Sequence, residues 1–309
     1  MSGFSRFAIR RLLASIPIIL GVILIVFLSV RMIPGDPAVL MAGPDARAED
    51  IERLRDRFGL NDPLYMQYFK YIGNLLKGDL GDSIRTDTPV GKDIGRFYIN
   101  TIQLAGFAIL IALFFSIPIG IFSAIRRGAF IERLTFIISM LGITAPNFWI
   151  ALILQLIFAV KLGIFHTSGK ESFADLILPA VTMAAYPLAS LVRQVRASML
   201  EVLGEDYVRT AHAKGIKPSR VYFRHALKNA MIPIITMTGY QFAMALGGAI
   251  VAETVFAYPG VGRYLILSIS TRDYSAIQST VLVIAVTYVF ISFLVDLAYH
   301  LIDPRISYE

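Results

Sequence analysis

The sequence predicts an all-α integral membrane protein with six transmembrane helices. Of its 309 residues, 56% are hydrophobic and only 17% are charged, and the mean hydropathy is +0.66. A soluble protein of this length could bury a core, but it would be less apolar on average. Six stretches reach about 20 mostly apolar residues, the length that a helix needs to cross the hydrocarbon core. Basic residues concentrate in the loops on one side of these stretches, as the positive-inside rule expects.

The six stretches follow one another along the chain. They are Leu12–Val30, Thr101–Ile125, Leu134–Val160, Leu176–Val192, Met231–Ala252 and Ser279–Leu301. Arg6, Arg10 and Arg11 precede the first stretch, as in a secretory signal peptide. Its apolar part of about 19 residues exceeds the usual signal length, so we expect a retained helix. Pro179 and Pro187 interrupt the fourth stretch, which a span tolerates because neighbouring helices satisfy the freed carbonyl groups.

The basic residues also predict the orientation. Fifteen lie in short loops or termini on one side: Arg6, Arg10, Arg11, Arg126, Arg127, Arg133, Arg193, Arg196, Arg209, Lys214, Lys217, Arg220, Arg224, Lys228 and Arg305. Four lie on the other side: Lys161, Lys170, Arg263 and Arg272. Both termini are therefore expected in the cytoplasm. The net charge of +7 would also suit nucleic-acid binding, but the basic residues follow the topology and form no stripe with interleaved aromatic residues.

The spans divide the chain into three parts. These are the N-terminus with the first helix (1–31), an extracytoplasmic helical loop (32–100) and a transmembrane core (101–309) with a cytoplasmic loop at 199–230. In the outer loop, Ile51, Leu54 and Phe58 recur at helical spacing before Gly59. A second outer helix is expected to begin at Asn61-Asp62-Pro63.

The second outer helix is rich in aromatic residues and is expected to end at Gly78. Its aromatic side chains are Tyr65, Tyr68, Phe69 and Tyr71. Aromatic residues favour the depth of the membrane interface, so an interfacial helix is one interpretation. Docking of an external partner is the other. A further short amphipathic piece is expected around Tyr264–Ile269.

Motifs for most enzyme chemistry are missing from the sequence. There is no cysteine, and the four histidines are scattered. The phosphate-binding loop G-x-x-x-x-G-K-[ST], the H-E-x-x-H zinc motif and the G-x-S-x-G hydrolase motif are all absent. We therefore expect no catalytic residue, no metal site and no cofactor in this chain, and an intramembrane enzyme is disfavoured.

A few polar residues stand inside the predicted spans. Asp296 is the clear ionisable one, and it suits either an interfacial carboxylate or a proton relay. The uncharged residues Gln103, Thr144, Asn147, Thr236 and Gln241 are candidates for a translocation path, although such groups also hold helices together. The pair Gly247-Gly248 is expected to mark close helix packing.

The stretch 205–233 resembles a helix, a turn and a second helix between the fourth and fifth spans. Glu205-Asp206 suits a helix N-terminus, Gly215 a helix end and Pro218 the next helix start. A solvated basic loop would account for the charge. The small residues Ala211 and Ala213 beside the glycine instead favour a surface that another protein can approach closely.

This stretch resembles the EAA loop of ABC importer permeases, in its peptide/nickel-type form. The pattern D-Y-x-R-T-A-x-A-K-G followed by R-H-x-x-x-N-x-x-x-P is matched by Asp206 to Gly215 and by Arg224 to Pro233. Further motifs agree in order: Ile33-Pro34-Gly35-Asp36-Pro37, Gly59-Leu60-Asn61-Asp62-Pro63-Leu64, Gly78-Asp79-Leu80-Gly81, Glu253 to Arg263, Arg272-Asp273-Tyr274 and Asp303-Pro304-Arg305. The general family begins the loop with Glu-Ala-Ala, where this chain has Arg209-Thr210-Ala211.

The resemblance implies a type I ABC importer permease fold in the bacterial inner membrane. The partners implied are a second homologous permease in a heterodimer, two cytoplasmic ATPases that bind ATP and magnesium, an extracytoplasmic solute-binding protein and membrane lipid. ATPase coupling would fall to Asp206, Tyr207, Arg209, Thr210, Ala211, Ala213, Lys214 and Gly215. The solute would be a dipeptide, an oligopeptide or glutathione, moved by alternating access. The alternative is an ATP-independent channel or proton-coupled carrier that uses Asp296.

Overall fold

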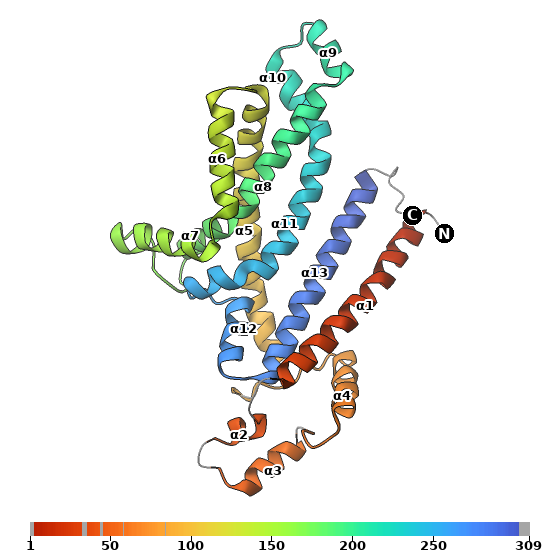
Figure 1. The fold of residues 1–309 in the computed structure, drawn as a ribbon, viewed down its shortest axis with the longest axis vertical. Coiled ribbons are helices and arrows are strands. Elements are labelled where there is room, and N and C mark those ends of the chain that lie inside the picture. Colours follow the sequence, from red (N-terminus) through yellow and green to blue (C-terminus); the bar gives the residue numbers. More distant parts are fainter. Residues whose placement is uncertain (1–2, 33–35, 44–45, 58, 84, 303–309) are drawn as a thin grey trace. The chain divides into compact units, whose positions relative to one another are not determined.

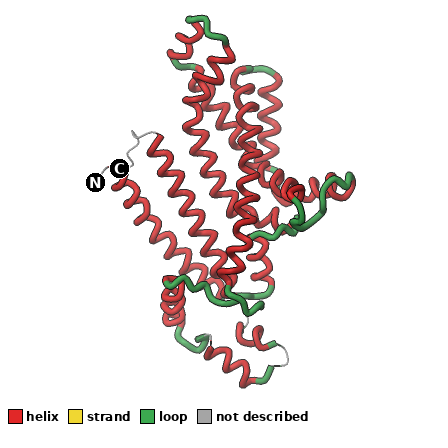
Figure 2. Tube along the Cα trace, turned by 180° about the vertical axis from the view of Figure 1, so that it is seen from behind, coloured by secondary structure: helices red, strands yellow, loops and turns green. Residues whose placement is uncertain are grey.

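The computed structural model describes residues 3–32, 36–43, 46–57, 59–83 and 85–302. Within these residues the chain is helical, and its isolated β-bridge between Asp82 and Pro89 belongs to no strand (Figure 2). The chain forms two compact units. The first comprises 1–101 and 259–289, and the second comprises 102–258 and 290–309.

Five helices of the described chain are long and apolar enough to cross a membrane, and a bent helix pair makes a sixth candidate. The five lie in α1 (Gly3–Arg31), α5 (Val90–Ile125), α8 (Ile177–Leu203), α11 (Leu227–Val255) and α13 (Tyr274–Ile302) (Figure 1). The predicted all-helical fold with six apolar segments is therefore confirmed.

The third predicted span, Leu134–Val160, is wrong as one straight helix. The chain forms α6 (Phe130–Thr144), then α7 (Asn147–Leu154) continued by the π-helical segment η1 (Gln155–Lys161), and the two parts meet at a bend of 103°. Ala145 between them is extended, with φ −68° and ψ 128°. The cause is Pro146, because a proline ring disfavours the helical conformation for the residue before it. In Figure 1, α7 accordingly runs across the direction of α6.

The first unit holds the short helices of the outer loop. They are α2 (Pro37–Ala42), α3 (Ala48–Arg57), α4 (Leu64–Leu76) and, from the later segment, α12 (Val261–Ser270). The predicted helices at 51–58, 61–78 and 264–269 thus exist, although Phe58 lies outside the described residues. Ile33, Pro34 and Gly35 of the Ile33–Pro37 motif also lie outside the described residues, as does the motif Asp303-Pro304-Arg305. Pro63 is the N-cap of α4, one residue before its predicted position.

Helix α4 packs on the end of α1 through aromatic rings. The ring centres of Tyr68 and Tyr71 lie 5.1 Å and 6.0 Å from that of Phe27. Arg31 stacks on Phe27 at 3.5 Å and its Nε donates to Gln67 Oε1 over 3.0 Å. The aromatic residues of α4 therefore divide into two groups. Tyr68 and Tyr71 pack on α1, whereas Tyr65 and Phe69 stay exposed.

The core of the second unit lies where α5, α8 and α11 meet. Its buried residues are mainly alanines with Leu104, Met183 and Leu246. The close approach of α5 to α8 depends on glycine, because a β-carbon on Gly120 would lie 2.6 Å from the Val195 side chain. A β-carbon on Gly239 would lie 2.4 Å from Val295 Cγ2.

The expectation that Gly247-Gly248 marks close packing is wrong within the described chain. Both glycines are exposed, and a β-carbon on either would meet no atom of the described residues within 4 Å. The positions that need glycine are instead those that face another helix of the chain. Which glycine faces a neighbouring helix depends on the rotation of each helix about its axis. The sequence Gly247-Gly248 does not by itself determine that rotation.

Asp36 holds α2 to α3 with its carboxylate. Its Oδ1 accepts from the Ala38 N–H over 2.9 Å, and its Oδ2 accepts from Arg55 Nε over 2.8 Å. Burial acts to raise the pKa of Asp36, but the hydrogen bonds from Arg55 and Ala38 outweigh it and hold the pKa below its usual range. A depressed pKa stabilises the folded state above the unfolded pKa of about 4, and this contribution is lost as the pH falls through the folded value.

Replacement of Asp36 with asparagine is expected to loosen α2 at neutral pH but not at low pH. Asparagine caps a helix as well as aspartate does but loses the ion pair, so the α2 amides should exchange with deuterium up to about fivefold faster. The ratio of exchange rates between variant and wild type should fall toward one below about pH 3. The exposed Asp50→Asn variant is the control. A ratio that does not change with pH would show that the carboxylate charge is irrelevant.

Candidate functional site

The stretch 205–233 folds as a helix, a glycine turn and a second helix. Helix α9 (Asp206–Ala213) ends at Lys214, and Gly215 follows with φ +69°, a conformation that favours glycine. Pro218 stands at the start of α10 (Pro218–Arg220), which continues through the π-helical segment η3 (Val221–Ala226) into α11. In Figure 1 the segment joins the ends of α8 and α11. The local structure predicted from Gly215 and Pro218 is confirmed.

One face of α9 packs inward. Val208 and Ala211 are 1% and 8% exposed and cluster with the fully buried Val221. Val202 and Leu203 at the end of α8 also pack on this cluster. The side chain of Ala211 thus lies inside the segment, so the argument that its small size admits another protein is wrong for this residue. Its small size instead lets α9 approach Val221.

The other face of α9 is open. Seven of the eight residues predicted for coupling are exposed, namely Asp206, Tyr207, Arg209, Thr210, Ala213, Lys214 and Gly215. Arg209 pairs with Asp206 over 3.4 Å, but both side chains are mostly exposed, so the pair adds little stability.

Tyr207 is fixed by a residue on the following helix. Asn229 Nδ2 donates to the Tyr207 hydroxyl over 2.6 Å across 22 positions of sequence. This contact orients the aromatic ring on the open face of α9. Asn229 is part of the second half of the loop pattern, but its contact with Tyr207 could not be read from that pattern.

The five residues predicted for a translocation path lie apart along the chain. Thr144 and Asn147 flank the break between α6 and α7, and the hydroxyl of Thr144 donates to the Met140 carbonyl over 2.6 Å. On α11, Thr236 Oγ1 donates to the Ile232 carbonyl, and Gln241 is 2% exposed. Gln103 on α5 is exposed and lines a groove. Among the five predicted path residues, all of which the structure describes, only Gln103 lines this groove.

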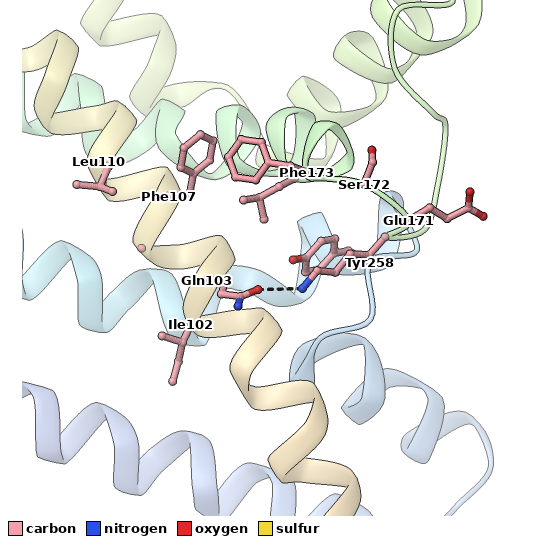
Figure 3. A pocket seen from close by; sticks show the side chains of 11 residues that line it. Ile102, Gln103, Phe107, Leu110, Glu171, Ser172, Phe173 and Tyr258 are labelled. Carbon is pink, nitrogen blue, oxygen red and sulfur yellow. Dashed lines mark hydrogen bonds between the residues drawn. The ribbon is translucent and has the colours of Figure 1, made fainter.

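The groove lies between α5 and the segment that precedes α8, and it has a volume of about 660 Å³. Its lining is Ile102, Gln103, Gly106, Phe107, Leu110, Lys170, Glu171, Ser172, Phe173, Leu176 and Tyr258. Lys170 Nζ donates to Gln103 Oε1 over 2.9 Å and lies 5.5 Å from the centre of the Tyr258 ring (Figure 3). Sequence reasoning used Lys170 only as a charge outside the cytoplasm, and a lone lysine in a short loop carries no further signal.

Tyr258 is the buried polar residue of the groove wall. Its side chain is fully buried, and its hydroxyl has no hydrogen-bond partner among the described residues. Burial, with the charge of Glu253 nearby, raises the pKa of Tyr258 to about 12. The hydroxyl therefore keeps its proton and is a hydrogen-bond donor at neutral pH.

Comparison with known families covers most of the chain. Residues 116–308 match the family described as binding-protein-dependent transport system inner membrane component, and residues 4–90 match the N-terminal membrane component of the same systems. The chain is 41% identical over 330 residues to the dipeptide transport system permease protein DppB of Alkalihalophilus pseudofirmus. It is 42% identical over 304 residues to the glutathione transport system permease protein GsiC of Escherichia coli K12. Both alignments cover 98% of this chain and 99% of the relative.

Solved structures agree at the level of the fold. A chain of the MetNI methionine ABC transporter in an inward-facing conformation superposes with a TM-score of 0.56 at 17% identity, over 70% of this chain and 96% of that chain. A chain of an amino acid ABC transporter gives a TM-score of 0.50 at 16% identity, over 70% of this chain and 95% of that chain. The helical architecture and the two sequence matches agree, and the chain belongs to the family of inner membrane components of binding-protein-dependent transport systems.

Proposed function

We infer that the chain is one permease subunit of an ATP-driven importer of short peptides, and that α9 is the coupling helix that binds an ATPase subunit. The observation that carries this is the two-sided construction of α9, with Val208 and Ala211 packed inward and Tyr207 and Ala213 open. A helix whose inner face is packed on the end of α8 and on η3, which continues into α11, can transmit a push to those helices, whereas a solvated loop cannot.

The partners follow from the family and from the missing phosphate-binding loop. Two cytoplasmic ATPases supply the energy, an extracytoplasmic binding protein delivers the solute, and a second homologous permease completes the path in a heterodimer. Both termini and α9 lie on the cytoplasmic side, and the segment 32–100 lies outside. Peptides or glutathione as the solute is supported by the relatives, which are a dipeptide permease and a glutathione permease. Alternating access, driven by closure of the ATPases, moves the solute inward.

Cysteine cross-linking tests the role of α9 directly, because the chain contains no cysteine of its own. Ala213→Cys, labelled with a thiol-reactive reagent that carries a photoactivatable group, is expected to form a cross-link to the ATPase subunit in the reconstituted complex, with a yield that changes on addition of ATP. Lys77→Cys is the matched control, since Lys77 is exposed at the end of α4, on the side predicted to be outside. Equal yields at the two positions would refute the assignment.

Transport by the isolated chain tests the alternative. An ATP-independent carrier would take up solute when this chain alone is placed in liposomes, and Asp296→Asn would abolish that uptake. The importer assignment expects no uptake by the isolated chain, and uptake by the full complex only with ATP and loaded binding protein. Uptake without ATPases would overturn it.

A further inference from the structure

Helix α4 carries an apolar stripe that the described chain leaves uncovered. Its members are Tyr65, Phe69 and Leu76, which are 65%, 68% and 84% exposed and lie four and seven residues apart, on one side of the helix. Phe69 meets the ring of its chain neighbour Tyr68 at 6.0 Å between ring centres and stays mostly exposed. We propose that this outer stripe lies among lipids, at the boundary between headgroups and acyl chains in the leaflet at which α1 ends. In the orientation proposed above, this is the outer leaflet of the membrane.

The contacts between α4 and α1 set the depth of α4 in the membrane. The Tyr68 ring lies against Phe27 near the end of α1. Gln67 Oε1 accepts hydrogen bonds from Nε and Nη2 of Arg31 over 3.0 Å and 2.9 Å, which ties the first turn of α4 to the last turn of α1 (Figure 1). Arg31 is the first charged residue after the apolar run 12–30, so the span leaves the hydrocarbon at this point. A helix held by Phe27 and Arg31 therefore lies at the interface.

The same contacts fix the rotation of α4 about its axis. At about 100° per residue, the outer stripe lies about 100° from the side that packs on α1. The exposed polar side chains of Lys70 and Asn74 lie about 140° further round the helix. Helix α4 thus has one sector for α1, one apolar sector and one polar sector. This arrangement suits a helix at the membrane interface, because the apolar sector can face the acyl chains while the polar sector faces water.

Lipid fits the outer stripe better than a water-soluble protein does. Leu24, Ile25 and Leu28 are exposed within one turn of the contact with α4, on a helix long and apolar enough to cross the membrane. The apolar surface of a span therefore adjoins α4. A protein that approached from the water would meet the polar sector first. The Tyr65 side chain also suits this depth, where an aromatic ring lies among lipids and its hydroxyl reaches water.

A nitroxide spin label tests the position of the outer stripe, because the chain has no cysteine and a single one takes the label at a chosen place. The readout is the ratio of collision rates with oxygen, which concentrates in lipid, and with a water-soluble nickel chelate. In proteoliposomes, the ratio for labelled Phe69→Cys should be at least about threefold that for labelled Asn74→Cys, the matched control on the polar sector. Tyr65→Cys, one turn earlier on the stripe, is a second reporter and should agree with Phe69→Cys.

A charge on the stripe tests whether its apolar character places the helix in lipid. With the label at Tyr65→Cys, the added change Phe69→Glu should lower the ratio toward that of Asn74→Cys, because a carboxylate draws this sector toward water. The change Asn74→Glu is the control and should leave the ratio unaltered.

The occupant is decided by repeating the measurement in the complete transport complex, built with cysteine-free partner subunits. Assembly and the addition of loaded binding protein should leave the ratio at Phe69→Cys unchanged. Equal ratios at Phe69→Cys and Asn74→Cys would overturn the inference. A fall in both collision rates on assembly, or on addition of binding protein, would show that a protein covers the stripe and would overturn it too. Uptake does not enter this measurement, so a complex that fails to transport refutes the proposed function alone.

Discussion

Replacement of Val208 with aspartate is expected to abolish ATP-driven uptake while leaving the membrane-spanning helices folded. Val208 is 1% exposed and packs with Ala211 and Val221. Burial of a carboxylate at this position costs at least about 3 kcal/mol, so α9 should detach from the end of α8 and from η3. At 1.4 kcal/mol per factor of ten, uptake should fall at least about 100-fold.

Two controls separate this effect from a general loss of folding. Val208→Thr keeps the shape of the side chain and should retain most of the uptake. Ser219→Asp places the same charge at an exposed position of the following helix and should change uptake little. The yield and thermal unfolding temperature of the purified chain should stay near those of wild type in all three variants. Full uptake by Val208→Asp would show that the packing of α9 is not part of the coupling route.

Replacement of Gly239 with alanine is expected to give the second large effect, in this case on stability. The added β-carbon would lie 2.4 Å from Val295 Cγ2 and 3.3 Å from its Cγ1. Overpacking of this kind costs about 1–3 kcal/mol in a packed core. The measurement is the unfolding free energy of the purified chain, together with the yield of folded protein from the membrane.

A second substitution should relieve the clash. Val295→Ala removes both γ-carbons and leaves the Val295 β-carbon at 3.4 Å, an ordinary contact. The double variant should therefore be more stable than Gly239→Ala, although Val295→Ala by itself loses packing. Gly247→Ala is the control, because a β-carbon there meets no described atom within 4 Å and alanine favours the helix. Additive effects of the two changes would show that Gly239 and Val295 are not in contact.

Local features of the chain were predictable because their causes lie within a few residues. Gly59 and Gly78 end their helices with φ +63° and +78°, and Gly215 does so with φ +69°. Pro218 begins the next helix. In each case the preference belongs to the residue itself, because glycine permits positive φ at little cost and proline restricts φ to the value of a first helical turn. Pro146 carries the same kind of signal, but the apolar run continues on both sides of it and therefore favours a single span.

Contacts between distant residues were not predictable in the same way. The hydrogen bond from Lys170 to Gln103 joins residues 67 positions apart, and that from Asn229 to Tyr207 joins residues 22 apart. Both residues of each pair were visible in the sequence, but their approach depends on how the helices are rotated and offset. Ala211 shows the same limit, since its small size is a property of the sequence but the direction of its side chain depends on packing.

The sequence by itself determined that this is a membrane protein of helical spans with a helix–turn–helix between the fourth and fifth. Hydropathy is a property of each segment, and the backbone preferences of glycine and proline are properties of each residue. Both can therefore be read from the sequence before the tertiary structure is known. Only the tertiary structure decided that Val208 packs inward, that Gly239 rather than Gly247 meets a neighbouring helix, and that Lys170 reaches Gln103 beside Tyr258. These outcomes depend on packing between helices, where a shift of one residue rotates a helix by about 100° and so changes which side chains face its neighbours.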